Sequence, residues 1–105
     1  MLVCQWHLDV PYGKQSEALR AIAAWGKEKF ASSGFSKAKG GRVMVGAIGA
    51  SAAHIVDEYL FESLADFEAA LKDMNAERFR KLSDQLAPYV VAGSQKWVVW
   101  RVIEA

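Results

Sequence analysis

His7 is the residue of this sequence whose type and neighbours best fit proton-transfer chemistry. Gln5 and Asp9 lie two residues before and after it, and side chains spaced by two share one face of a β-strand. A histidine beside a carboxylate gains or loses a proton near neutral pH, so it can act as a general acid or base. We therefore predict His7 as a candidate catalytic residue, with Gln5 and Asp9 as ligand-binding neighbours. The alternative is a histidine that is hydrogen-bonded across an interface between two copies of the chain.

Two arginines and two aromatic residues complete the predicted ligand site. Arg42 and Arg101 lie near the ends of predicted strands, where a guanidinium group can hold a carboxylate through two parallel hydrogen bonds. Trp97 can stack on a flat, conjugated ligand, and Tyr59 can help to orient that ligand. Each prediction has an ordinary structural alternative, which is ion pairing for the arginines and core packing for Trp97.

Neither a metal nor a cofactor is expected. His7 and His54 are not spaced as ligands on one helix, and the Gly-rich segments do not lead into helices as phosphate-binding loops do. The single cysteine, Cys4, excludes an internal disulfide and a Cys-rich metal site. Cys4 falls among apolar strand positions, where a thiol acts as inert packing. His54 begins a predicted strand and is expected to be an exposed or edge histidine outside the site.

Composition indicates a globular chain without a strong attraction to polyanions. The 105 residues predict one domain, residues 1–105, and they are 52% hydrophobic and 24% charged. Thirteen Lys and Arg residues against twelve Asp and Glu residues leave a net charge of +1. This charge favours neither nucleic acid nor an anionic membrane as partner. The polar residues within positions 1–10 are atypical of a signal peptide, so we expect a cytoplasmic protein.

Apolar periodicity predicts four strands and two helices in the order β-α-β-β-α-β. The predicted strands cover residues 2–10, 42–48, 53–61 and 95–103, and the predicted helices cover 14–30 and 64–87, before Pro88. The second helix is expected to begin at a Ser63 cap and to break near Asn75, where one apolar stripe gives way to another. Two such halves joined by right-handed crossovers build a ferredoxin-like α+β fold, with a four-stranded antiparallel sheet and both helices on one face.

Two helices cover only one face of such a sheet, so the other face is expected to carry the binding surface. We assign the wholly apolar set of alternating residues in three strands to the helix side: Cys4, Trp6 and Leu8; Val43, Val45 and Ala47; Val98, Trp100 and Val102. The open face then carries the polar residues around His7 and these apolar ones: Met44, Trp97, Val99 and Ile103. In the third predicted strand neither alternating set is clearly apolar, and we favour the set with Tyr59 and Phe61 for the open face. An apolar surface of this extent is normally covered, and a second sheet or a ligand is expected to cover it.

Two short motifs resemble those of the dimeric α+β barrel superfamily. Residues 10–14, VPYGK, are similar to the strand-to-helix entry of these proteins. Residues 61–69, FESLADFEA, are similar to their third-strand aromatic residue, acidic residue and capped second helix. The superfamily includes cofactor-free antibiotic-biosynthesis-type monooxygenases, NIPSNAP-like and EthD-like proteins, and stress-responsive barrels. The resemblance implies a homodimer whose two sheets meet face to face around an interior cleft. Lys72, Met74 and Asn75 occupy the region where many monooxygenase-like members carry a histidine.

These observations predict a small homodimeric barrel protein that binds a small hydrophobic or aromatic molecule in the barrel cleft without catalysis. The dimer is expected to form through the open sheet face, with no nucleic acid or membrane as partner. The alternative is a cofactor-free monooxygenase-like or isomerase/cyclase-like enzyme that uses His7 as its acid/base. An open cleft lined by His7 favours ligand handling, whereas a filled barrel favours a structural role.

Overall fold

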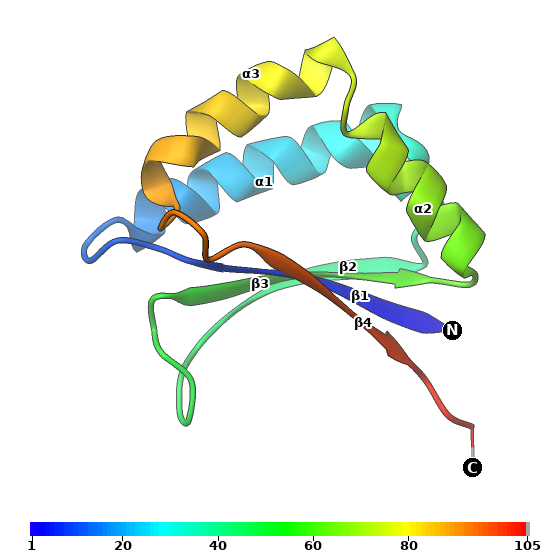
Figure 1. The fold of residues 1–105 in the computed structure, drawn as a ribbon, viewed down its shortest axis with the longest axis horizontal. Helices are drawn as coiled ribbons and strands as arrows, with labels where there is room; N and C mark the ends of the chain where they lie inside the picture. Colours follow the sequence, from blue (N-terminus) through cyan, green and yellow to red (C-terminus); the bar gives the residue numbers. More distant parts are fainter. Residues whose placement is uncertain (105) are drawn as a thin grey trace.

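The computed structural model describes residues 1–104 and shows a four-stranded sheet with its long helices on one face (Figure 1). The elements are β1 (Leu2–Asp9), α1 (Gln15–Ser32), the 3-10 helix η1 (Gly34–Lys37), β2 (Gly40–Val45), β3 (His54–Phe61), α2 (Leu64–Asp73), α3 (Glu77–Leu86), the 3-10 helix η2 (Ala87–Tyr89) and β4 (Lys96–Arg101). The strand order is β2-β3-β1-β4, and every pairing is antiparallel. This is the predicted ferredoxin-like α+β fold. Ala105, the last residue of the predicted domain, lies outside the described residues.

The alternation predicted for β1 is confirmed. One set of its residues is buried beneath the helices: Leu2, Cys4, Trp6 and Leu8. The residues between them are half-buried on the opposite face. Burial raises the pKa of the Cys4 thiol to about 11. The thiol therefore stays protonated and packs as an apolar group, as expected for a buried cysteine.

The faces predicted for β3 and β4 are wrong. Directly opposed residues of antiparallel strands share a face, and Cys4 is opposed to Tyr59 on β3 and to Val99 on β4. The helix side therefore holds residues that were expected on the open face: Tyr59, Phe61, Trp97, Val99 and Arg101. In their place, the open face holds Val98 and Trp100, which are opposed to Gln5 and Val3.

The physical reason is that neither strand carries a pattern that separates its two faces. Positions 97–100 of β4 are all apolar, and β4 is an edge strand that is incompletely covered on each side. In β3, each alternating set contains one acidic residue. Asp57 lies on the helix side and pairs with Lys29, whereas Glu58 lies on the open face and pairs with Arg42. Contacts between distant segments therefore decided the orientation of both strands.

The prediction that Val43 and Val45 of β2 face the helices is confirmed. Val43 and Val45 are opposed to Asp57 and Ile55 of the helix-facing set. The strand ends at Val45, however, so Ala47 lies in the loop that leads to β3. Ile103 likewise lies beyond the end of β4 and is 78% exposed.

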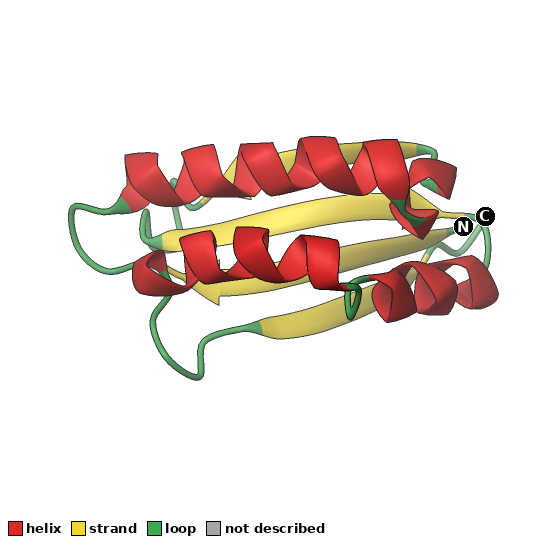
Figure 2. Cartoon of the chain, turned by 90° about the horizontal axis from the view of Figure 1, so that it is seen from above, coloured by secondary structure: helices red, strands yellow, loops and turns green. Residues whose placement is uncertain are grey.

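The predicted break in the second helix is also confirmed. The chain leaves α2 at Asp73 and enters α3 at Glu77, on either side of Asn75. The Ser63 hydroxyl accepts a hydrogen bond from the backbone N–H of Asp66 at 3.2 Å, so it caps α2. The break lets α2 pack on η1 while α3 packs on α1, and Figure 2 shows α2 and α3 in line beside α1. Within residues 1–104, no helix has both the length and the apolar composition needed to cross a membrane.

Two glycines differ in the space that they leave for a side chain. A Cβ atom at Gly26, inside α1, meets no atom within 4 Å, whereas one at Gly34 lies 3.0 Å from the Cα atom of Ala70 in α2. Gly26→Ala is expected to raise the free energy of unfolding by about 0.5–1 kcal/mol, because alanine is the better helix former. Gly34→Ala is expected to lower it by about 1–3 kcal/mol, because η1 must move away from α2. Urea denaturation of both variants checks this, and equal effects contradict the close packing at Gly34.

Candidate functional site

A chain of hydrogen bonds joins the polar side chains of the open sheet face. Nδ1 of His7 lies 2.8 Å from Nε2 of His54, and Nδ1 of His54 lies 2.7 Å from Oδ1 of Asp9. His54 and Asp9 are directly opposed on β3 and β1, and this register brings the two rings and the carboxylate together. His54 was expected to stand outside the site, and that expectation is wrong, since it connects His7 to Asp9.

The chain continues from His7 to the edge strand β2. Nε2 of His7 lies 3.0 Å from Oε1 of Gln5, which also accepts a hydrogen bond from Nε1 of Trp100 at 3.1 Å. Nε2 of Gln5 donates to Glu58 at 2.8 Å, and Nε of Arg42 donates to Glu58 at 2.5 Å. Burial raises the pKa of Glu58, but these two hydrogen bonds and the charge of Arg42 outweigh it and hold that pKa below its ordinary value. Glu58 is therefore an ionised acceptor at the end of the chain.

The hydrogen-bond partners determine how many protons the two imidazole rings must share. Because Gln5 donates its amide to Glu58, its oxygen faces Nε2 of His7, and that nitrogen must carry a proton. Asp9 likewise requires a proton on Nδ1 of His54. One more proton between the two rings completes the hydrogen bonds of the series. Within residues 1–104, no group of three or more His, Cys, Asp or Glu side chains is arranged to hold a metal ion.

The surroundings of His7 predict that stability rises with pH. Partial burial lowers the pKa of His7 from its ordinary value of 6.5, and the charges of His54 and Lys96 lower it further. Just below pH 6.5 the unfolded chain therefore binds more protons at His7 than the folded chain does. Stability then increases as pH rises through this window and decreases as His7 is protonated. Urea denaturation between about pH 5.5 and pH 7.5 is expected to show this increase, and His7→Gln is expected to reduce it. An unchanged pH slope in the variant excludes His7 as its source.

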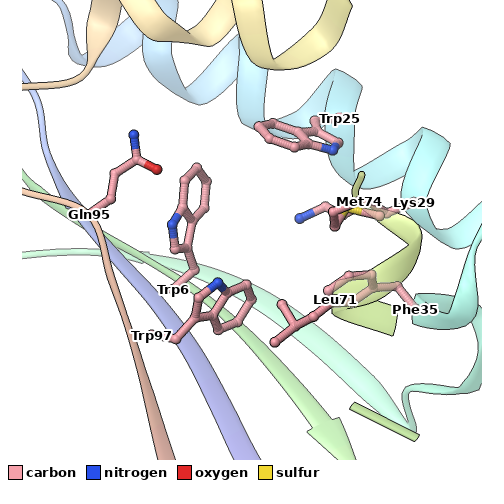
Figure 3. Close-up of a pocket in the computed structure, with 8 residues that line it drawn as sticks. All are labelled: Trp6, Trp25, Lys29, Phe35, Leu71, Met74, Gln95 and Trp97. Atoms are coloured by element: carbon pink, nitrogen blue, oxygen red, sulfur yellow. The ribbon is translucent and has the colours of Figure 1, made fainter. Parts of the chain in front are cut away.

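A cavity lies on the other side of the sheet, beneath the helices (Figure 3). Its volume is about 160 Å³, and its walls are mainly aromatic and apolar: Trp6, Trp25, Phe35, Trp97, Leu71, Met74, Gln95 and Lys29. Figure 3 shows the Lys29 nitrogen directed into the space bounded by the rings of Trp6, Trp25 and Trp97. Gln95 is exposed, so the cavity meets solvent on this side.

A buried ion pair between α1 and β3 holds the Lys29 side chain at the cavity wall. Nζ of Lys29 lies 3.1 Å from Oδ2 of Asp57, which also accepts a hydrogen bond from the Tyr59 hydroxyl at 2.7 Å. The Lys29 and Asp57 side chains are only 4% and 5% exposed. Four ring centroids surround Nζ, at 4.8 Å for Tyr59, 5.0 Å for Phe35, 5.3 Å for Trp25 and 5.9 Å for Trp6. Aromatic faces attract a cation at such distances.

Burial perturbs the protonation of this cluster. It lowers the pKa of Lys29, and the charge and hydrogen bond of Asp57 oppose that shift without cancelling it. Burial raises the pKa of Tyr59, and the adjacent Asp57 carboxylate raises it further, so Tyr59 stays a neutral hydrogen-bond donor. Lys29 therefore loses its proton more readily than a solvent-exposed lysine does.

The structure divides the predicted site residues between the two sides of the sheet. Four of them belong to the hydrogen-bonded chain of the open face: Gln5, His7, Asp9 and Arg42. Tyr59 and Trp97 lie on the cavity side, where Tyr59 donates to Asp57 and Trp97 lines the cavity. Arg101 is exposed at the end of β4. The expectation that these seven residues share one face is wrong, and their binding roles stay predictions.

Sequence reasoning missed Lys29 and Asp57, although the spacing of each residue from buried apolar neighbours indicates that it is buried. Lys29 follows Ile22 by seven residues and Ala18 by eleven, so it falls on the buried stripe of α1. Asp57 alternates with the buried Ile55 along β3. Charged side chains are rarely fully buried unless they are paired. Opposite charges at apolar periodic positions of two elements therefore indicate a buried ion pair.

Solved structures share this architecture at low sequence identity. A NIPSNAP family protein from Agrobacterium tumefaciens matches with a TM-score of 0.74 and 18% identity, over 98% of this chain and 93% of the other. An uncharacterized NIPSNAP domain protein from Burkholderia xenovorans matches with a TM-score of 0.73 and 15% identity, over 98% of this chain and 95% of the other. A candidate antibiotic biosynthesis monooxygenase from Nitrosomonas europaea matches with a TM-score of 0.68 and 14% identity, over 99% of this chain and 100% of the other. The chain has the fold of these proteins. No protein-family model and no curated protein matches its sequence.

The ferredoxin-like α+β fold of the single chain, which the resemblance implied, is thereby confirmed, whereas the face-to-face dimer stays a prediction. At 14–18% identity the likeness extends to the fold alone, because one fold hosts many unrelated activities. The chemistry of this chain must therefore be derived from its own cavity and its own polar groups.

Proposed function

We propose that this protein binds a small aromatic molecule of one ring, carrying an oxygen acceptor, in the cavity between the sheet and the helices. The observation that carries the proposal is the Lys29 amine directed into an aromatic-lined cavity of about 160 Å³. An engineered cavity of about 150 Å³ in another protein holds benzene, so this volume suits one ring. The ligand then lies on the helix side of the sheet, and not in the cleft expected at the open face.

One donor of the cavity wall, the Lys29 amine, suits an oxygen acceptor on the ligand. Nζ of Lys29 donates to Asp57 and otherwise faces aromatic rings, which leaves it able to donate to a carbonyl or carboxylate. Nε1 of Trp25 is buried, and within residues 1–104 it has no hydrogen-bond partner. A buried donor without an acceptor costs about 1–3 kcal/mol. Because this nitrogen has essentially no accessible surface, the Lys29 amine is the donor that a ligand in the cavity reaches.

The hydrogen bonds of the open sheet face favour a binding function for this protein over acid–base catalysis by His7. Both ring nitrogens of His7 are already engaged, one by His54 and one by Gln5. A general acid or base must reach the proton of its substrate directly or through one water molecule. His7 can do so only after one of these hydrogen bonds breaks, and the cavity lies across the sheet from it.

The binding proposal is tested with benzoate and ligand-observed NMR. Benzoate has one ring and one carboxylate, and saturation transfer from the protein to its ring protons is expected. Leu71→Trp fills the cavity from α2 and is expected to weaken binding by about tenfold or more, about 1.4 kcal/mol. Leu64→Trp is the matched control, because Leu64 lies on the same helix and is 49% exposed. Equal binding by both variants, or no binding by the wild-type protein, rejects the cavity as the site.

We also propose that two copies of the chain associate through their open sheet faces. Apolar side chains surround the hydrogen-bonded chain on this face: Val3, Met44, Val56, Leu60, Val98 and Trp100. Trp100 is 58% exposed, although its indole N–H already donates to Gln5. Association removes this apolar surface from water. It also buries the hydrogen-bonded polar side chains of this face, which already supply one another with hydrogen-bond partners.

Light scattering after gel filtration tests the association. The wild-type protein is expected to show about twice the chain mass of 11.6 kDa. Trp100→Glu is expected to show the single-chain mass, because it places an unpaired charge in the interface. Leu64→Glu, a substitution on the helix side, is expected to keep the wild-type mass. A single-chain mass for the wild-type protein at micromolar concentration rejects the dimer.

A further inference from the structure

We propose that Lys29 condenses reversibly with an aldehyde on a single aromatic ring to form an imine within the cavity. The inference rests on the proposed function, since it concerns the same cavity and names the class of ligand. It assigns Lys29 a covalent role, which neither the fold nor the likeness to other structures provides.

The amine is positioned for attack on a carbonyl carbon. Nζ of Lys29 is directed into the cavity (Figure 3), and Asp57 is its hydrogen-bond acceptor at 3.1 Å. The Trp25 and Phe35 ring centroids lie 5.3 and 5.0 Å from Nζ. A planar aldehyde that stacks within these walls brings its carbonyl group to the amine. Such confinement raises the effective concentration of one reactant at the other.

Asp57 provides the acid–base group that imine formation needs. The lysine must lose a proton to attack, and Asp57 lies within hydrogen-bond distance to accept it. Burial also lowers the pKa of Lys29, which increases the fraction of reactive neutral amine. The Tyr59 hydroxyl donates to the same Asp57 oxygen and keeps the carboxylate in place.

The reaction conserves both atoms and charge. The Lys29 nitrogen bonds to the aldehyde carbon, and the carbonyl π electrons move to oxygen, which takes up a proton. The carbinolamine then loses its oxygen as water, which carries away two hydrogens from the original ammonium group. The product is a protonated imine with the same single positive charge. Asp57 and the surrounding rings therefore stabilise the product as they stabilise the ammonium group, and no oxidant or reductant is required.

Reductive trapping tests the proposal on the whole protein. Benzaldehyde and borohydride convert an imine into a stable benzyl-lysine, which peptide mass spectrometry locates. Lys29 is expected to carry about tenfold more label than Lys27, an exposed lysine on the same helix. Benzoate is expected to compete. Lys29→Arg keeps the charge but cannot form an imine, and it is expected to lose the preferential label. Leu71→Trp keeps the lysine, fills the cavity and is expected to reduce labelling of Lys29.

The outcomes separate this inference from the binding proposal. Equal or lower labelling of Lys29 relative to Lys27, while benzoate still binds the wild-type cavity, overturns imine formation and leaves the proposed function standing. Preferential labelling of Lys29 that Leu71→Trp leaves unchanged also overturns the inference, because the reaction then does not need the cavity. If benzoate does not bind and Lys29 is not labelled, both proposals fail. Circular dichroism of Lys29→Arg and Leu71→Trp establishes that each variant is folded.

Discussion

Asp57→Ala is expected to lower the free energy of unfolding by about 3–5 kcal/mol, because it leaves the Lys29 ammonium group buried without a counter-charge. The Lys29 and Asp57 side chains are 4% and 5% exposed and lie 3.1 Å apart. The substitution also removes the acceptor of the Tyr59 hydroxyl. Urea denaturation followed by tryptophan fluorescence measures the change, since Trp6 and Trp25 lie beside Lys29.

Two comparisons establish that the loss arises from the buried pair. Glu62→Ala removes the partner of Lys39 in an ion pair whose side chains are 54% and 65% exposed, and it is expected to cost about 0–1 kcal/mol. The double variant Lys29→Met/Asp57→Leu is expected to be more stable than Asp57→Ala, because it buries no unpaired charge. An Asp57→Ala variant as stable as Glu62→Ala contradicts the buried ion pair.

Phe35→Ala is expected to lower the free energy of unfolding by a similar amount, about 3–5 kcal/mol. Phe35 is fully buried, and its ring centroid lies 4.7 Å from that of Tyr59, 5.8 Å from that of Phe61 and 6.4 Å from that of Trp97. Truncation removes these contacts and leaves a void that the sheet and η1 fill only in part. Thermal and urea denaturation measure the loss.

The same substitution is expected to change the ligand that the cavity accepts. Phe35 lines the cavity, so its truncation enlarges a space suited to one ring. Binding of a two-ring acid such as 2-naphthoate is expected in Phe35→Ala and not in the wild-type protein. Phe30→Ala is the matched control, because Phe30 is 40% exposed and lies outside the cavity lining. It is expected to cost less than Phe35→Ala and to leave ligand size unchanged, and equal stability losses argue against Phe35 as the centre of the aromatic core.

The local elements of this fold could be predicted from the sequence because each depends on neighbours in the chain. The alternation of residues 2–9 identified β1 and its buried set. The Ser63 cap and the change of apolar stripe at Asn75 located the start of α2 and its separation from α3. The order of these elements, together with the right-handed crossover rule, was sufficient to predict the ferredoxin-like sheet.

The orientation of β3 and β4 was decided by the tertiary structure alone. Alternation shows which residues of a strand share a face, but it does not show which face the helices cover. The register against β1 supplied this information and moved Tyr59 and Trp97 to the cavity side.

The site depends on contacts between segments that are distant in sequence. His7 and His54 are 47 residues apart, and Lys29 and Asp57 are 28 residues apart. The polarity of His7 and Asp9 could be read from the sequence, but the histidine that connects them could not. A hydrogen bond or a buried ion pair requires partners within a few ångströms, and only the packing of β3 against β1 and α1 brings these groups that close.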